Sequence, residues 1–133
     1  MPVVVLHTIS VNDILENKGC MFAYMDHEKQ KGNPTVNTRL RNHSNVAPII
    51  VKKSSGTEPK SYYKDDEFHV FQKQFDKTMS VVNNHVVGGG TVIMCRESID
   101  NEDFNMEEIK KHSPQAYKHI DKHLNNFMKR HKL

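Results

Sequence analysis

The stretch DDEFHVFQKQFDKTMSVVNNHVVGGGTVIMC, residues 65–95, decides the expected fold. Its apolar residues recur at spacings of three, four, four and three, which places them on one helix face: Phe68, Phe71, Phe75, Met79 and Val82. Asp65 and Asp66 precede them, where the positive end of a helix dipole favours acidic side chains. The pattern predicts a helix over residues 66–84 that buries one face.

The glycine triplet 88–90 follows this helix and precedes the apolar run TVIMC, residues 91–95. Glycine ends helices readily, and a short apolar run bounded by glycine is typical of a buried strand. A glycine triplet can also cradle phosphate, but no P-loop lysine follows here. The triplet is therefore interpreted first as punctuation between a helix and a strand.

Working outward, apolar runs at residues 3–6, 20–25 and 47–51 predict three more strands. Ser10 with Asp13 resembles a capping box that opens a short helix, whereas residues 26–35 carry charges, Gly32 and Pro34 and predict a surface loop. Ser113 and a following proline open a last amphipathic helix over 114–130. This alternation predicts a layered α/β fold with a mainly parallel or mixed central sheet of at least four strands, flanked by helices.

The composition indicates one domain over residues 1–133. With 36% hydrophobic and 26% charged residues, the chain is neither low-complexity nor disordered. Its apolar runs are too short to span a membrane, and the N-terminus lacks the pattern of a secretory signal. We therefore expect a cytoplasmic protein with no membrane contact, in which Cys20 and Cys95 are buried free thiols.

Charge is distributed unevenly along the chain. Residues 110–133 hold seven Lys or Arg and one acid, a net +6, so a total of +3 leaves −3 for the first 109 residues. The outer face of the last helix carries four of these cations: Lys118, Lys122, Lys129 and Arg130. This face is a candidate surface for nucleic acid or a partner protein, although a merely solvated face is commoner. Tyr62 and Tyr63 are the aromatics expected at the surface, and single-strand binders need such rings.

His119 and His123 have the i, i+4 spacing that places two imidazoles on one helix face. No third ligand stands at a recognisable spacing, and Arg130 lies on the same helix, so we expect solvated polar residues and no metal. Motifs such as HExxH, paired cysteines or GxSxG are also missing from the sequence. No catalytic residue and no cofactor are therefore assigned.

The segment from Tyr24 to Lys53 and a shorter one near the end match a set of family patterns. F-G-D-N falls on residues 24–27, the first glycine of G-x-G-G-Q-A falls on Gly32, and A-P-K-T-[FY] falls on residues 113–117. The block R-G-x-x-N-x-x-G-I-P-T-K aligns with Arg41, Asn45, Ile49 and Lys52. In these motifs the chain resembles a family of small macrodomain-like α/β domains that is common in phages and bacteria.

The resemblance implies a macrodomain-like fold that binds a nucleotide or an ADP-ribose-like ligand. It implies that Asp26 accepts hydrogen bonds from adenine or ribose and that Arg41 holds a phosphate, and it places the ligand among Asp26, His27, Gly32, Arg41, Asn45 and Lys52. The sequence departs from the family where Pro34 and Thr35 replace a double glycine, and where an acidic stretch after Arg96 replaces D-G-x-G-T-G. Bulkier residues obstruct the close approach of backbone N–H groups to phosphate.

Two functional hypotheses follow. In the first, a phage-type accessory protein binds a nucleotide-like small molecule and thereby counters host defence. In the second, the pocket is degenerate and the protein binds a host protein, or less favourably a nucleic acid, through the basic helix and the acidic segment 97–108. Neither hypothesis requires catalysis, and the oligomeric state is left open.

Overall fold

A computed structural model describes residues 3–28, 43–54, 58–95 and 106–131 of the chain. The elements follow in the order β1 (Val3–Leu6), α1 (Val11–Glu16), β2 (Cys20–His27), β3 (Val46–Lys52), the 3-10 helices η2 (Pro59–Ser61) and η3 (Asp65–Glu67), α2 (Phe68–Val87), β4 (Thr91–Cys95), α3 (Met106–His112) and α4 (Pro114–Arg130). The predicted alternation is confirmed, and the last helix has its predicted bounds. The helix predicted over 66–84 begins two residues later and extends to Val87.

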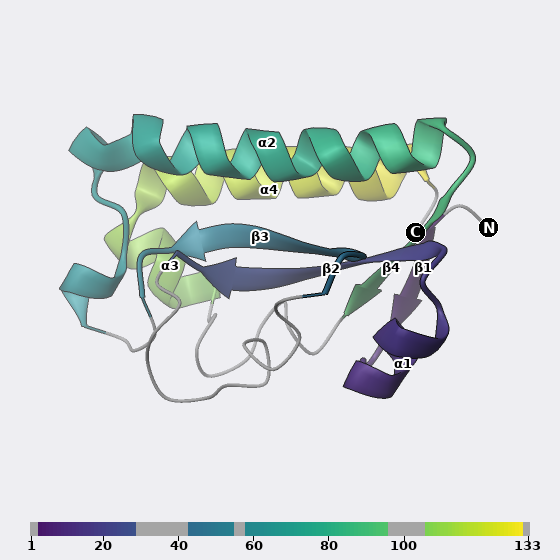
Figure 1. Cartoon of the computed structure of the whole chain (residues 1–133). Coiled ribbons are helices and arrows are strands. Elements are labelled where there is room, and N and C mark those ends of the chain that lie inside the picture. Colours follow the sequence, from purple (N-terminus) through teal and green to yellow (C-terminus); the bar gives the residue numbers. More distant parts are fainter. Residues whose placement is uncertain (1–2, 29–42, 55–57, 96–105, 132–133) are drawn as a thin grey trace.

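One sheet contains all four strands in the order β1-β4-β2-β3, and every neighbouring pair is parallel. This confirms the expected layered α/β fold. Parallel pairing places the carboxyl ends of all four strands at one edge of the sheet. Figure 1 shows the arrowheads of β2 and β3 next to each other, with α3 beside them.

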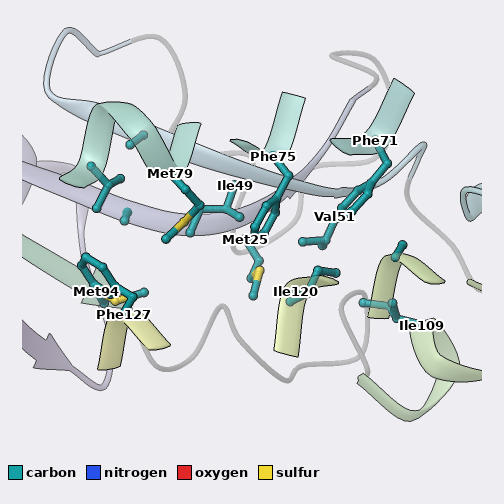
Figure 2. Packing of buried hydrophobic residues seen from close by; sticks show 14 of the residues in the cluster. Met25, Ile49, Val51, Phe71, Phe75, Met79, Met94, Ile109, Ile120 and Phe127 are labelled. Carbon is teal, nitrogen blue, oxygen red and sulfur yellow. The ribbon is translucent and has the colours of Figure 1, made fainter. Parts of the chain in front are cut away.

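Two long helices, α2 and α4, lie side by side over one face of the sheet (Figure 1). Figure 2 shows Phe71, Phe75 and Met79 extending from α2 toward the strands, where they meet Met25 and Ile49. Helix α4 adds the buried Ile120 and Phe127 to the same cluster, and α3 adds Ile109. Both predicted apolar stripes therefore face the core, which confirms the helical periodicity.

The short helix α1 covers part of the opposite face, where Ile9 and Ile14 pack against Phe22, Tyr24 and Cys95. The expected capping box is present, because the Asp13 amide donates to Ser10 Oγ and the Ser10 amide donates to the Asp13 carboxylate. The connection from β1 to β2 therefore crosses one face of the sheet through α1, and the connection from β3 to β4 crosses the other face through α2. The two connections run across the sheet in opposite directions, so both can be right-handed only if they lie on opposite faces.

Strand β3 forms one edge of the sheet, and Pro48 lies inside it. Proline has no backbone donor and is therefore tolerated mainly in edge strands. The carbonyl of Pro48 accepts a hydrogen bond from the Thr78 hydroxyl of α2, at 3.1 Å. The hydrogen bond from Thr78 therefore joins α2 to β3 at Pro48, the residue of β3 that has no backbone N–H.

The glycine triplet has the predicted role of punctuation. Gly88 ends α2, and Gly89 has a φ of 92°, a left-handed conformation that L side chains rarely adopt. The amide of Gly90 donates to the His85 carbonyl at 2.8 Å, and a Cβ at Gly90 would lie 2.3 Å from His85 Nε2. These glycines turn the chain from α2 into β4 and let His85 pack against the turn.

Both cysteines are free thiols, as expected, but only Cys95 is buried. Cys20 is half-buried because it is the first residue of β2, at the end of the strand. Among the described residues, no helix is both long enough and apolar enough to cross a membrane.

Candidate functional site

The strand β2 continues two residues beyond the predicted range of 20–25. Asp26 and His27, which the sequence placed in a surface loop, pair with β3 and are each only 1% exposed. The loop prediction was wrong here because cross-strand pairing with β3, up to the pair His27 and Lys52, extends the strand despite its charged residues. The backbone N–H of His27 donates to Asp26 Oδ1 at 2.8 Å.

Lys52 ends β3 beside His27 and is fully buried. Its Nζ lies 4.8 Å from the ring centroid of Tyr62, within the range of a cation–π contact. Tyr62 in turn stacks on His112 of α3, with ring centroids 4.7 Å apart. A lysine buried at a strand end, with an aromatic ring against its ammonium group, is a conspicuous exception to the rule that lysine heads stay in water.

A hydrogen-bonded network of polar side chains borders these buried groups. The Tyr63 hydroxyl donates to the Glu28 carboxylate at 3.0 Å and accepts from Gln74 at 3.1 Å. Burial, reinforced by the charge of Glu28, raises the pKa of Tyr63 well above its usual range. Next to it, Lys53 forms a 2.8 Å ion pair with Glu67, and this hydrogen bond lowers the pKa of the Glu67 carboxyl.

Tyr62 and Tyr63 are therefore not surface rings. Each is 1% exposed, because both belong to the core: Tyr62 packs against Lys52 and His112, and Tyr63 contacts Phe71. The expectation that they could stack on nucleic-acid bases was wrong, although Lys60 and Lys64 stand on either side of them in the sequence.

The structure brings together three of the residues named by the family resemblance: Asp26, His27 and Lys52. Asn45 lies at the other end of β3, where its Nδ2 donates to the carbonyls of Ile14, Asn17 and Cys20 at 3.0, 3.2 and 3.3 Å. This position ties α1 and the start of β2 to β3 and is remote from the carboxyl edge. Gly32 and Arg41 lie outside the described residues.

At β1 and β4, away from the ends of β2 and β3 that carry Asp26, His27 and Lys52, the carboxyl edge has the topology of a binding crevice. β1 and β4 are neighbours, but the chain leaving β1 leads to α1 on one face, whereas β4 is followed by α3 and α4 on the other. Open α/β sheets bind ligands outside the carboxyl ends of strands, where the connections diverge in this way. A separate, mainly apolar pocket between β4 and α4, lined by Met94, Tyr117 and Leu124, holds none of the predicted ligand residues.

The basic helix has its cations on the outside, as expected. Lys118, Lys122, Lys129 and Arg130 are exposed, and Arg130 donates to Asn83 of α2 at 3.2 Å. Within the described part of the chain, no carboxylate forms an ion pair with the three lysines.

The pair His119 and His123 differs from the expectation of solvated residues. Both imidazoles are half-buried, their ring centroids are 4.2 Å apart, and His119 Nε2 lies 2.7 Å from Oδ1 of Asp76. Sequence spacing missed Asp76 because this residue stands on α2, which packs against α4 only in the folded chain. Burial and the neighbouring His119 lower the pKa of His123.

These features define the class of the protein: a layered α/β domain with an all-parallel four-stranded sheet and buried ionisable groups at its carboxyl edge. A family model matches residues 4–123, and the chain belongs to that family, DUF7831, a family of unknown function. No curated protein and no solved structure matches the chain.

Proposed function

We propose that this protein binds a nucleotide or an ADP-ribose-like ligand at the carboxyl edge of its sheet. One observation carries the proposal: Asp26, His27 and Lys52 are ionisable, almost completely buried and gathered at the ends of two neighbouring strands. Burying groups that can ionise costs several kcal/mol unless they are well compensated. Such groups cluster at binding and catalytic sites more often than elsewhere.

Each of the three residues has a role that its chemistry suits. The Asp26 carboxylate accepts hydrogen bonds from an adenine amino group or ribose hydroxyls. Lys52 and His27 supply donors for phosphate oxygens, and Arg41, outside the described residues, is assigned a bidentate phosphate contact. The resemblance to macrodomain-like domains supports this assignment. The proposed biological use is sequestration of a nucleotide signal by a phage-type accessory protein in the host cytoplasm.

The test is a thermal-shift screen against AMP, ADP, ATP, NAD⁺ and ADP-ribose at millimolar concentration. A saturating ligand stabilises the folded state by RT ln(1 + [L]/Kd), so a ligand at about 100 times its Kd adds about 2.7 kcal/mol. We expect a clear rise in Tm with at least one compound. No rise with any compound would remove the proposal.

Three variants assign the shift to the carboxyl edge. Lys52→Met keeps the length of the side chain without its charge, and Asp26→Asn keeps the shape of the carboxylate. Both, like Arg41→Ala, should lose the ligand-induced shift, measured against each variant's own Tm. Lys53→Met is the matched control, because Lys53 is the next residue but pairs with Glu67 instead of joining the buried group. A shift that persists in Lys52→Met would place the ligand elsewhere.

A second candidate function is supported by the exposed lysines of α4. Lys118, Lys122 and Lys129 project from one helix and are not paired with described carboxylates. This charge suits an acidic surface on a host protein better than a nucleic acid, because the surface rings that would supplement it are buried. Affinity purification from host lysate, compared with a Lys122→Glu, Lys129→Glu variant, tests this candidate.

A further inference from the structure

We propose that Asp76, His119 and His123 form a binding site for a divalent transition-metal ion of the zinc type. The site is separate from the carboxyl edge of the sheet and does not depend on the function proposed there. It lies where α2 and α4 pack against each other, with the carboxylate on α2 and both imidazoles on α4.

The spacing of the ligand atoms suits one ion. One carboxylate oxygen and one ring nitrogen from each histidine all lie within 4.8 Å of one another. Zinc binds nitrogen and oxygen ligands at about 2.0–2.2 Å, so two ligands of one tetrahedral ion are roughly 3.3–3.5 Å apart. Asp76 and His119 are 2.7 Å apart as a hydrogen-bonded pair, and small side-chain rotations open this distance to the required value.

The imidazoles are held in place by aromatic rings. Phe68, Phe71 and Phe75 all contact the His119 ring edge to face, with ring centroids 5.6, 5.8 and 5.4 Å away. Phe75 also contacts His123 at 6.2 Å. Because these phenylalanines belong to or border the main core, the two ring nitrogens are oriented before any ion arrives. Pre-organised ligands lose little conformational entropy on binding.

The donor set determines the class of metal. Two imidazoles and one carboxylate suit zinc and its neighbours cobalt, nickel and copper, whereas magnesium and calcium prefer oxygen ligands alone. The positive charge of Lys122 repels a cation at this site and reduces the affinity for the metal ion. The other nearby cation, Arg130, donates a hydrogen bond to Asn83 instead of facing the site.

Three protein ligands leave at least one coordination position open. Asp76 is exposed, with about half of its side-chain surface accessible, so this position faces water. A bound water or an incoming anionic group would complete the coordination shell. This arrangement is that of an accessible site, unlike a closed structural site with four protein ligands.

The test uses untagged full-length protein that has been treated with a chelator and then titrated with Co²⁺ and Zn²⁺. Bound Co²⁺ gives visible d–d absorption bands, which report nitrogen and oxygen ligands directly, and calorimetry gives the Zn²⁺ affinity. We expect one ion per chain, and a Tm that rises with Zn²⁺. No visible bands and no heat at about 0.1 mM metal, a concentration that reveals any site of useful affinity, would overturn the proposal.

Variants of similar shape assign the ion to this cluster. Asp76→Asn and His123→Asn should each weaken Zn²⁺ binding by at least about tenfold, since each removes one of three ligands. His69→Asn is the matched control, because His69 is an exposed histidine on the same helix as Asp76 and outside the cluster. If all three variants bound Zn²⁺ as tightly as the unsubstituted protein, or if only His69→Asn lost affinity, the ion would bind elsewhere. Circular dichroism of the metal-free variants verifies that each is folded.

Discussion

Replacing Phe75 by alanine tests the central packing of the fold. Phe75 is completely buried between the sheet and α4, and its ring lies 5.4 Å from both Phe71 and His119. Truncation of a buried phenylalanine typically costs about 3–5 kcal/mol, because apolar contacts are lost and a cavity remains. A chain of this length has a total stability of roughly 7–20 kcal/mol, so the variant should still fold.

Urea denaturation followed by circular dichroism measures the effect. With a denaturant slope near 2 kcal/mol/M, a loss of about 3–5 kcal/mol lowers the midpoint by roughly 1.5–2.5 M. Val81→Ala on the same helix is the control, because Val81 is 45% exposed and its truncation should change stability by less than about 0.5 kcal/mol. A loss below about 1 kcal/mol for Phe75→Ala would refute the packing of α2 against the sheet.

Three further predictions follow from described contacts. Asn45→Ala should destabilise the fold by about 1–3 kcal/mol in urea denaturation, because three carbonyls lose their shared donor, whereas the exposed Asn125→Ala should be nearly neutral. Because the pKa of Tyr63 is raised in the folded state, the unfolded chain loses a proton above about pH 10 that the folded chain keeps. The free energy of unfolding therefore falls as the pH rises, by at most about 1.4 kcal/mol per pH unit. Tyr63→Phe should remove this component of the pH dependence, which urea denaturation at several pH values measures. Finally, we expect that the protein causes no electrophoretic mobility shift of DNA or RNA at low salt. Binding to nucleic acid would contradict this if log K fell with log[salt] at a slope of about −3 to −4 and if that slope became shallower in the double variant Lys122→Glu, Lys129→Glu.

Periodicity and capping chemistry sufficed to predict most elements. The helix at 114–130 was predicted with its observed bounds because a proline after a serine opens it and an unbroken apolar stripe runs through it. The parallel sheet followed from the alternation of strands and helices, which allows few other arrangements.

The carboxyl edge was harder to predict because its residues break the local rules. Asp26 and His27 are charged or polar, so strand propensity ends β2 before them, and Lys52 likewise follows the apolar run of β3. Pairing between the two strands nevertheless extends both of them to these residues. Such conflicts between local propensity and tertiary context are expected at functional sites. Tyr62 was wrongly predicted to be exposed for a similar reason: the lysines near it in the sequence indicate a solvated segment, whereas tertiary packing buries its ring.

Asp76 could not have been found from spacing at all. It stands 43 residues before His119, and only the packing of α2 on α4 brings the two within 2.7 Å. An i, i+4 pair of histidines is visible in a sequence, but the ligand that completes it comes from a helix whose angular position the sequence does not specify.

Pro48 and Thr78 bear on how copies of this chain behave at high concentration. An exposed edge strand offers a row of donors and acceptors to any other extended chain, which is how domain swapping and fibril growth begin. In β3 that row is interrupted at its third residue, since Pro48 has no N–H and its carbonyl already accepts the Thr78 hydroxyl. An incoming strand cannot complete its ladder across this gap, so the same residue pair that fastens α2 to the sheet also protects the edge from self-association.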